Sequence, residues 1–235
     1  MLIVNSRFGQ IIAGFGSCGR RQTAARIFPN MKSFEMAHTL TQHDDADIPP
    51  ELIGVTHMTA EQFEQVCRKY RKLRLELTST GELIVMPPTG ALTGLRNAHL
   101  TTQLMTWAEN DGSGVCFGNT VGFMLPNNAI REPDASWIRR EKWDSLSQEQ
   151  KERFVPFCAD FVAELRSRID RLPVLFRKME EYIANGASLG WLIDPSTRRV
   201  YVYRPNEEVV VLENPETVSG EPLLPGFTLN VCKLW

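Results

Sequence analysis

Paired cysteines and histidines at metal-ligand spacing are both missing from this sequence. The five cysteines lie far apart and none belongs to a CxxC pair, and the four histidines show no spacing typical of a metal site. Zinc-binding and dithiol redox motifs are thereby excluded. Scattered thiols are typical of a reducing compartment, so we expect a cytoplasmic protein whose cysteines are mostly buried and structural.

Long apolar runs and a strong net charge are missing as well. No apolar run reaches the roughly 18 residues of a membrane helix, so we expect no membrane partner. The net charge of −2 excludes a polycation, and any nucleic-acid binding must come from local patches. With 43% hydrophobic and 23% charged residues, the chain of 235 residues is predicted to be globular with a substantial core.

Acidic residues are absent before Glu35, although five basic residues occur there. Three interpretations fit this composition. A targeting peptide is acid-poor. A dinucleotide-binding fingerprint would use the glycines at 14, 16 and 19, but no second parallel strand follows them. The interpretation we favour is a disordered or non-native extension over residues 1–50, with natural translation starting at Met36, followed by one domain over residues 51–235.

From Pro50 onward, regular hydrophobic periodicity predicts helices and strands. A capping box at Thr59 and Gln62 begins a helix that ends in the basic run RKYRKLR, and two strands then flank a turn at Gly81. The basic run is either a solvated face or a phosphate contact. A second helix is expected over residues 95–110, and it is followed by a strand with a glycine bend (VCFGNTVGFMLP) and a returning strand (IREPDASWI).

A polar helix over residues 147–154 is expected before the short strand within DFVAELR. The next helix stops at Asn185–Gly186, and LGWLID, RRVYVYRP and EEVVVLEN are predicted strands. From residue 95 the order is therefore helix, three strands, helix, strand. This order predicts an α/β fold with a mixed sheet, helices on its faces and extra C-terminal strands.

Two acids stand out in this pattern. Glu164 occupies a position in an apolar strand where another aliphatic residue is expected, and a buried carboxylate is costly without a partner. Asp134 lies in the preceding predicted strand, so both carboxylates can converge at one sheet edge. A divalent cation relieves the repulsion of such a pair, and Mg²⁺ prefers oxygen ligands. Arg166 is expected on the same strand face, and Lys178 on the following helix can reach the same edge.

Five segments together resemble the Uma family of the PD-(D/E)XK nuclease superfamily, over roughly residues 56 to 230: LELTSTGELIVMPPTG, REPDASWI, CADFVAELRS, KMEEYIANGASLGWLIDP and LLPGFTL. The resemblance implies a restriction-endonuclease-like αβββαβ core and hydrolysis of phosphodiesters that depends on Mg²⁺ (or Mn²⁺). It implies that Asp134 and Glu164 bind the metal, and that Lys178 replaces the usual motif lysine, whose position is taken by Arg166. Glu76 matches an acid of the family's N-terminal hairpin and is a further metal ligand or a structural group.

The chain departs from the family pattern PDFVIELRSPSD at two places. Ala159 replaces the first proline, which changes only the entry to the strand. Arg168 and Ile169 replace Pro-Ser just after the candidate site, which puts the loop geometry in question. Each site residue also has a structural interpretation: Asp134 could cap a turn, Glu164 could pair with Arg166 or Arg171, and Lys178 could be solvated.

Two functions are therefore carried forward. The first is a metal-dependent endonuclease acting on nucleic acid, expected to be DNA. The second is a catalytically impaired nuclease-fold protein that acts as a nucleic-acid-binding or assembly module, which an always-charged arginine at position 166 would favour. A homodimer is expected in either case. The C-terminal strands create edges that need covering, and Trp143, Phe157 and Trp235 are candidate apolar surface residues.

Deletion of residues 1–35 should leave the thermal unfolding midpoint unchanged, because residues 1–45 show no amphipathic periodicity and are expected to pack little. Differential scanning calorimetry of the full and shortened chains measures this. A loss of several degrees would correspond to roughly 1 kcal/mol or more and would show that the segment packs against the domain.

Overall fold

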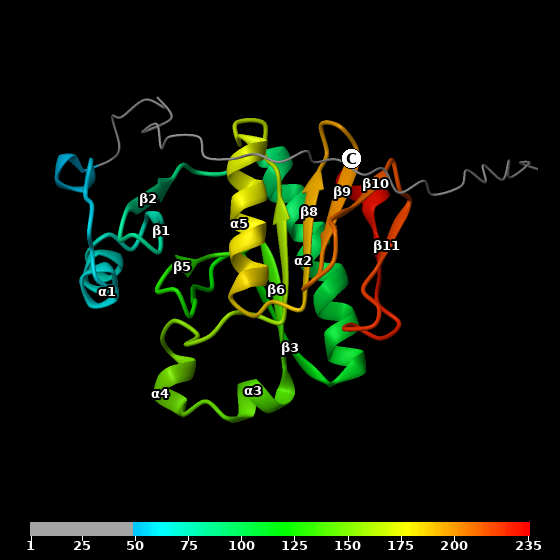
Figure 1. Ribbon diagram of the computed structural model, residues 1–235, viewed down its shortest axis with the longest axis horizontal. Helices are drawn as coiled ribbons and strands as arrows, with labels where there is room; N and C mark the ends of the chain where they lie inside the picture. Colours follow the sequence, from blue (N-terminus) through cyan, green and yellow to red (C-terminus); the bar gives the residue numbers. More distant parts are fainter. Residues whose placement is uncertain (1–48) are drawn as a thin grey trace, which may run out of the picture.

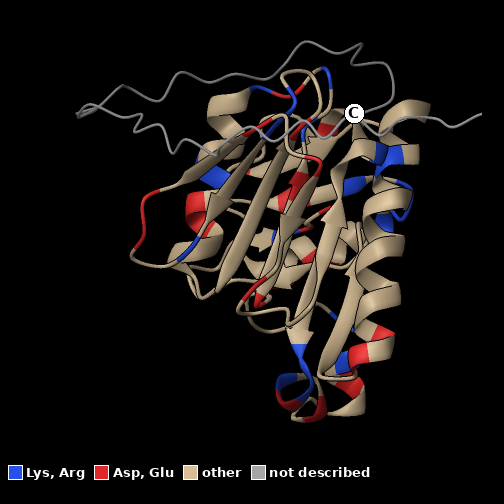
Figure 2. Cartoon of the chain, turned by 90° about the vertical axis from the view of Figure 1, so that its right-hand side faces the viewer, with Lys and Arg blue, Asp and Glu red and all other residues tan. Residues whose placement is uncertain are grey.

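The computed structural model describes residues 49–235, so the predicted extension over residues 1–50 lies almost entirely outside the described residues. The described chain forms a six-stranded central sheet, a four-stranded small sheet and a two-stranded pair (Figure 1). Figure 2 shows that most of the strand surface carries neither acids nor bases. Charged residues inside the sheet are therefore exceptions that require an explanation.

The central sheet has the strand order β10-β9-β8-β7-β6-β3. β7 and β8 are parallel, and each other neighbouring pair is antiparallel. The parallel pair is joined through helix α5, as parallel strands require a crossover. The strands are β3 (Gly114–Gly118), β6 (Ala135–Arg139), β7 (Phe161–Leu165), β8 (Leu189–Asp194), β9 (Arg199–Tyr203) and β10 (Val210–Glu213).

Two long helices cover opposite faces of this sheet (Figure 1). Helix α2 (Ala91–Asp111) lies on one face and α5 (Leu172–Ala184) on the other. The sequence α2, β3, β6, β7, α5, β8 reproduces the predicted order of helix, three strands, helix and strand. The predicted αβββαβ core, with extra strands β9 and β10, is therefore confirmed.

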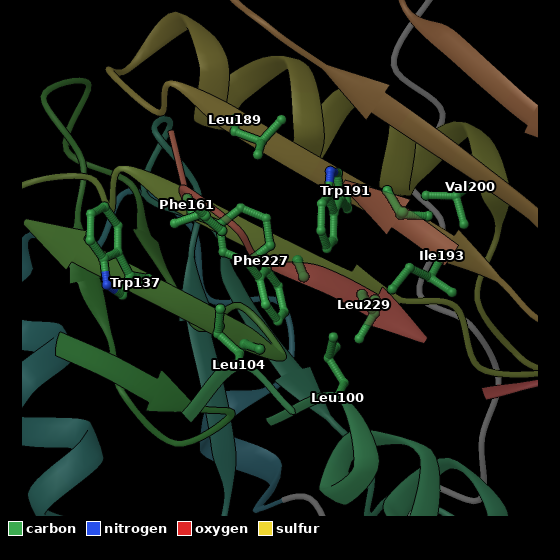
Figure 3. Close-up of a cluster of buried hydrophobic side chains, with 14 of the residues drawn as sticks. Leu100, Leu104, Trp137, Phe161, Leu189, Trp191, Ile193, Val200, Phe227 and Leu229 are labelled. Carbon is green, nitrogen blue, oxygen red and sulfur yellow. The ribbon is translucent and has the colours of Figure 1, made fainter. Parts of the chain in front are cut away.

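Apolar side chains at helical spacing on α2 and alternating side chains on the strands form the core beneath α2. Leu100 and Leu104 of α2 are fully buried against Trp137, Phe161 and Trp191 (Figure 3). The C-terminal segment closes the same cluster, which explains why the chain continues beyond the core strands. It contains β11 (Thr217–Ser219), β12 (Thr228–Asn230) and the 3-10 helix η3 (Val231–Leu234).

The small sheet has the order β2-β1-β5-β4 and packs against α1 (Ala60–Lys69). The capping box predicted at Thr59 and Gln62 is present, and Gly81 takes a positive φ of 81° in the turn between β1 and β2. Phe63 of α1 is fully buried against Leu75 and Leu77 of β1. The strands are β1 (Arg74–Leu77), β2 (Leu83–Met86), β4 (Phe123–Met124) and β5 (Ile130–Arg131), and a 3-10 helix, η2 (Pro50–Leu52), precedes α1.

Three local expectations were wrong in detail. The segment predicted as one bent strand is divided between β3 and β4. The segment predicted to return as one strand is divided between β5 and β6. Asp134 therefore lies just before β6 rather than within a strand. The chain switches here from the central to the small sheet and back. The predicted polar helix is shortened to α4 (Gln148–Lys151), and a short helix that was not predicted, α3 (Arg140–Asp144), precedes it.

The three aromatic residues expected on the surface are partly buried instead. Trp143 and Phe157 pack against the core cluster beneath α5, and Trp235 packs against the cluster beneath α2. They therefore do not supply the apolar surface on which the homodimer prediction partly rested. Across residues 49–235, no helix combines the length and apolar character needed to cross a membrane.

Replacing Gly114 with Ala should destabilise the fold because an added Cβ would lie 2.2 Å from the Trp137 ring and 2.3 Å from the Ile138 carbonyl oxygen. We expect a loss of at least about 1–3 kcal/mol in the free energy of unfolding, measured by urea denaturation. Gly94→Ala is the matched control. Its Cβ meets no atom within 4 Å, and it should gain about 0.5–1 kcal/mol in a helix interior. Equal stability of the two variants would contradict the packing.

Candidate active site

The strand register places Asp134 across from Glu164. Ala135 of β6 pairs with Ala163 of β7 in an antiparallel ladder, so the residue before Ala135 faces the residue after Ala163. Directly opposite residues of an antiparallel pair project from the same face. Glu164 projects toward the α5 side, whereas Asp134, which precedes β6, accepts hydrogen bonds from the Leu165 backbone and from Asn97 of α2. The two acids are near enough for the charge of Asp134 to raise the pKa of Glu164.

Glu164 is buried and contacts two residues of α5. Lys178 places its Nζ 2.7 Å from Glu164 Oε1, and the Tyr182 hydroxyl donates a hydrogen bond of 2.9 Å to the same oxygen. Lys178 and Tyr182 are four residues apart and therefore share one helical face. Because both contacts use Oε1, neither of them occupies Oε2.

Lys178 also reaches the small sheet. Its Nζ lies 2.8 Å from Oε1 of Glu76 on β1, and only 11% of its side chain is exposed. Glu76 receives two further donors: the backbone N–H of Glu132 at 2.9 Å and the Arg131 guanidinium at 3.2 Å. Lys178 thus links Glu76 and Glu164 across the junction of the two sheets, and its solvated interpretation is wrong.

Asp134 accepts hydrogen bonds from strand β7 and from helix α2. Its Oδ2 accepts the backbone N–H of Leu165 at 2.8 Å, and its Oδ1 accepts the Asn97 side-chain amide at 3.0 Å. Asn97 belongs to α2. The site therefore draws its residues from both covering helices as well as from the sheets.

Burial raises the pKa of Glu164 to about 7, and the nearby charges of Asp134 and Glu76 add to the rise while Lys178 opposes it. Burial also raises the pKa of Asp134, against the effect of the Leu165 N–H and Lys178. For Glu76, burial is outweighed by Lys178 and Arg131, and its pKa is lowered. Burial would lower the pKa of Lys178, but Glu164 and Glu76 outweigh it and raise the pKa, so Lys178 stays protonated.

The cluster as a whole holds more acids than bases. Its acids are Glu76, Glu132, Asp134, Glu164 and Glu181, and its bases are Arg74, Arg131 and Lys178. With all five acids and all three bases ionised, the cluster carries a net charge of −2. One divalent cation would neutralise this excess, and carboxylate oxygens suit Mg²⁺. Within residues 49–235, no three His, Cys, Asp or Glu residues form a group able to hold a metal ion. A cation here would therefore rely on two carboxylates, other oxygen donors and water.

Arg166 does not join this cluster. Its guanidinium lies 2.8 Å from Asp194 and also donates to Ser196 and to the carbonyl of Asp170. Strand β7 ends at Leu165, so Arg166 lies outside the strand. The alternation of side chains that predicted Arg166 on the same face as Glu164 therefore does not extend to it. The Asp170 side chain accepts the Ser167 N–H at 2.7 Å and closes the departing loop.

Asp160, the acid at the other end of β7, has a structural role. Its carboxylate accepts the Arg139 N–H at 3.0 Å and lies 2.8 Å from the Lys142 ammonium. In the basic run at the end of α1, Arg68 contacts Glu64, Lys69 contacts Glu51 and Arg74 contacts Glu132.

Three residues whose side chains contact Asp134, Glu164 or Glu76 were not singled out from the sequence. Asn97 interrupts the apolar stripe that contains Leu100 and Leu104, and this polar interruption was a detectable signal. Tyr182 was assigned only to the apolar face of its helix, and nothing in the sequence showed where its hydroxyl would point. Arg131 could not be assigned without knowing that β1 and β5 are neighbours.

Comparisons with known proteins place these observations in a family. Residues 60–232 match the family Uma2, described as "Putative restriction endonuclease". The fold is similar to the crystal structure of a "putative nuclease belonging to DUF820" from Anabaena variabilis ATCC 29413. That similarity has a TM-score of 0.59 at 19% sequence identity and covers 68% of this chain and 88% of the other. No curated protein matches the chain.

Glu164→Gln should change how stability depends on pH in metal-free buffer. The folded pKa of about 7 lies above the ordinary 4.5, so the folded state keeps a proton that the unfolded state loses. Wild-type stability should therefore fall as pH rises from about 4.5 to about 7, and this fall should be shallower in the variant. The groups facing Glu164 are Lys178, Tyr182, Asp134 and Glu76.

Urea denaturation across this pH range measures the effect. At about pH 8 the Gln variant should be as stable as the wild type or more stable, because a crowded negative charge is gone. Asp160→Asn, at the residue just before β7, is the control, and it should lose stability because its contact with Lys142 weakens. A loss of about 3–5 kcal/mol in Glu164→Gln would instead identify a structural ion pair.

Proposed function

Because the chain belongs to the Uma2 family, we propose that it is a metal-dependent endonuclease that hydrolyses phosphodiester bonds of nucleic acid, with Mg²⁺ (or Mn²⁺) as its cofactor and DNA as its substrate. The observation that carries this proposal is the pair formed by half-buried Asp134 and buried Glu164, with Lys178 in contact with Glu164. The excess of two negative charges in the cluster and the oxygen-rich donor set suit a divalent cation.

Asp134 and Glu164 would hold the cation, with the Leu165 carbonyl region and water completing its oxygen ligands. When bound, the cation would supply Lewis-acid stabilisation of the phosphoryl oxygens and activation of water. The chain itself fixes both carboxylates. The Leu165 N–H and Asn97 amide hold Asp134, and Lys178 and Tyr182 hold one oxygen of Glu164.

Lys178 provides the positive charge of the site. Because its pKa is raised, it remains an ammonium and is unsuited to accept a proton from water. Its roles are to hold Glu164 and to stabilise negative charge on the phosphate in the transition state. Arg166 is left out of the proposed set because its guanidinium binds Asp194 instead.

Glu76 is assigned as the positioning partner of Lys178 rather than as a metal ligand. Both of its oxygens already receive donors: Oε1 from Lys178 and the Glu132 N–H, and Oε2 from Arg131. Without Glu76, Glu164 would be the remaining acid in contact with Lys178 in this cluster. Lys178 would then compete more strongly with a cation for Glu164.

The alternative of a catalytically impaired binding or assembly module loses support from the position of Lys178. That alternative would be favoured by a lysine pointing away from Glu164, whereas the two side chains lie 2.7 Å apart. The homodimer and the cytoplasmic location remain predictions. Strand β10 at one edge of the central sheet is the remaining feature that suggests self-association.

Plasmid and single-stranded substrates of DNA and RNA, incubated with Mg²⁺ or Mn²⁺, test the proposal. Wild-type protein should cleave DNA, and EDTA should abolish cleavage. Asp134→Asn, Glu164→Gln and Lys178→Met should each reduce the rate by at least about 100-fold, since the first two weaken the hold on the cation and the third removes the positive charge beside the phosphate. The matched control is Asp160→Asn, a buried acid at the other end of β7, which should retain activity when folded.

Two results would contradict the proposal. Cleavage that persists in EDTA, or in all three site variants, would show that a contaminant or another site is responsible. A folded wild type that binds Mn²⁺ but cleaves none of the substrates would instead favour the binding or assembly module.

A further inference from the structure

Asn97 carries a buried oxygen that has no partner. The residue is 6% exposed and lies on the inner face of α2, in line with Leu100 and Leu104. Its amide nitrogen donates to Asp134 Oδ1 at 3.0 Å, whereas its Oδ1 is buried without any hydrogen-bond donor among residues 49–235. The orphaned oxygen belongs to the same carboxamide whose nitrogen donates to Asp134.

Packing alone does not explain an asparagine at this position. The neighbouring positions of the stripe are leucine, and an aliphatic residue would leave no polar atom unsatisfied. A buried carbonyl oxygen without a donor is unfavourable, and unpaired groups of this kind are rare in folded proteins. The orientation of the carboxamide is set by its neighbour, because an ionised Asp134 can only accept and thus takes the amide N–H.

We propose that Asn97 Oδ1 is a third protein oxygen of the cation site, beside Asp134 and Glu164, and that it contacts the cation directly or through one of its waters. The inference rests on the proposed metal-dependent function. Carboxamide oxygens are accepted ligands of hard cations such as Mg²⁺. A neutral oxygen has an advantage here, since a third carboxylate would add to the repulsion that already raises the pKa of Glu164.

The position of Asn97 in the fold supports this assignment. Asp134 precedes β6, Glu164 lies on β7, and α2 crosses the same sheet from the face opposite α5. With Asn97, the cation would be held by helix α2 as well as by residues of the central sheet. Helix α2 would thereby become part of the site instead of only a cover for the core.

Two substitutions separate a cation oxygen from a residue that only orients Asp134. Asn97→Leu is close to isosteric and removes both the amide donor and the oxygen. Asn97→Asp removes the donor but keeps an oxygen at the same position and makes it anionic. Gln103→Leu is the matched control, because it removes an amide from the same helix that hydrogen-bonds the backbone of Asn230, outside the site.

The test measures Mg²⁺ and Mn²⁺ affinity by isothermal titration calorimetry and the thermal unfolding midpoint with and without metal, using full-length protein. Asn97→Leu should weaken metal affinity by at least about tenfold. Without metal, Asn97→Asp should unfold at a lower temperature than wild type. When metal is added, its unfolding midpoint should rise by more than that of wild type, since a ligand that binds only the folded state stabilises it by mass action. Gln103→Leu should keep the wild-type affinity.

The outcomes distinguish this inference from the proposed function. If wild type shows no metal binding and no metal-dependent stabilisation, the proposed function and the role of Asn97 both fail. If wild type binds metal but Asn97→Asp loses affinity as Asn97→Leu does, Asn97 only orients Asp134 and this inference alone is overturned. Unchanged affinity in both variants would overturn it as well.

Discussion

The ion pairs of Lys178 connect helix α5 to both sheets. Its ammonium lies 2.7 Å from Glu164 on the central sheet and 2.8 Å from Glu76 on the small sheet. All three side chains are largely buried, so removing Lys178 would leave two acids without their shared cation in a poorly solvated region. The small sheet therefore does more than extend the fold, because it supplies the acid that holds the lysine in place beside Glu164.

The same region contains more negative charge than its bases can balance. Burial raises the pKa of Glu164, and the charges of Asp134 and Glu76 raise it further, against the effect of Lys178. A structural core has no need for such an arrangement, and Asp160 at the other end of β7 shows the alternative, where one acid is matched by Arg139 and Lys142. The contrast within one strand supports a functional site at Glu164 and a structural contact at Asp160.

The sequence predicted much of the fold and part of the site. Glu164 was detectable because it interrupts an apolar strand, and the elements were detectable because their periodicities are strong. Lys178 was noted because the helix after β7 could bring it to the same edge, but only the family resemblance gave it a role, since a lysine on an amphipathic helix has no local signal of burial. The partner of Arg166 could not be predicted, because Asp194 lies 28 residues away on a neighbouring strand and β7 ends before Arg166. The Tyr182 hydroxyl and the Asn97 amide likewise depend on how α5 and α2 dock on the sheet.

Anomalous diffraction from crystals grown in Mn²⁺ tests the central claim most directly, because it locates the cation independently of any cleavage assay. We expect one strong anomalous peak within bonding distance of a carboxylate oxygen of both Asp134 and Glu164, with Lys178 still in contact with Glu76. A peak at this position in the wild type and its loss in Glu164→Gln would establish the metal site. Crystals at saturating Mn²⁺ with no peak between the two acids, and with Lys178 still bridging Glu76 and Glu164, would contradict it.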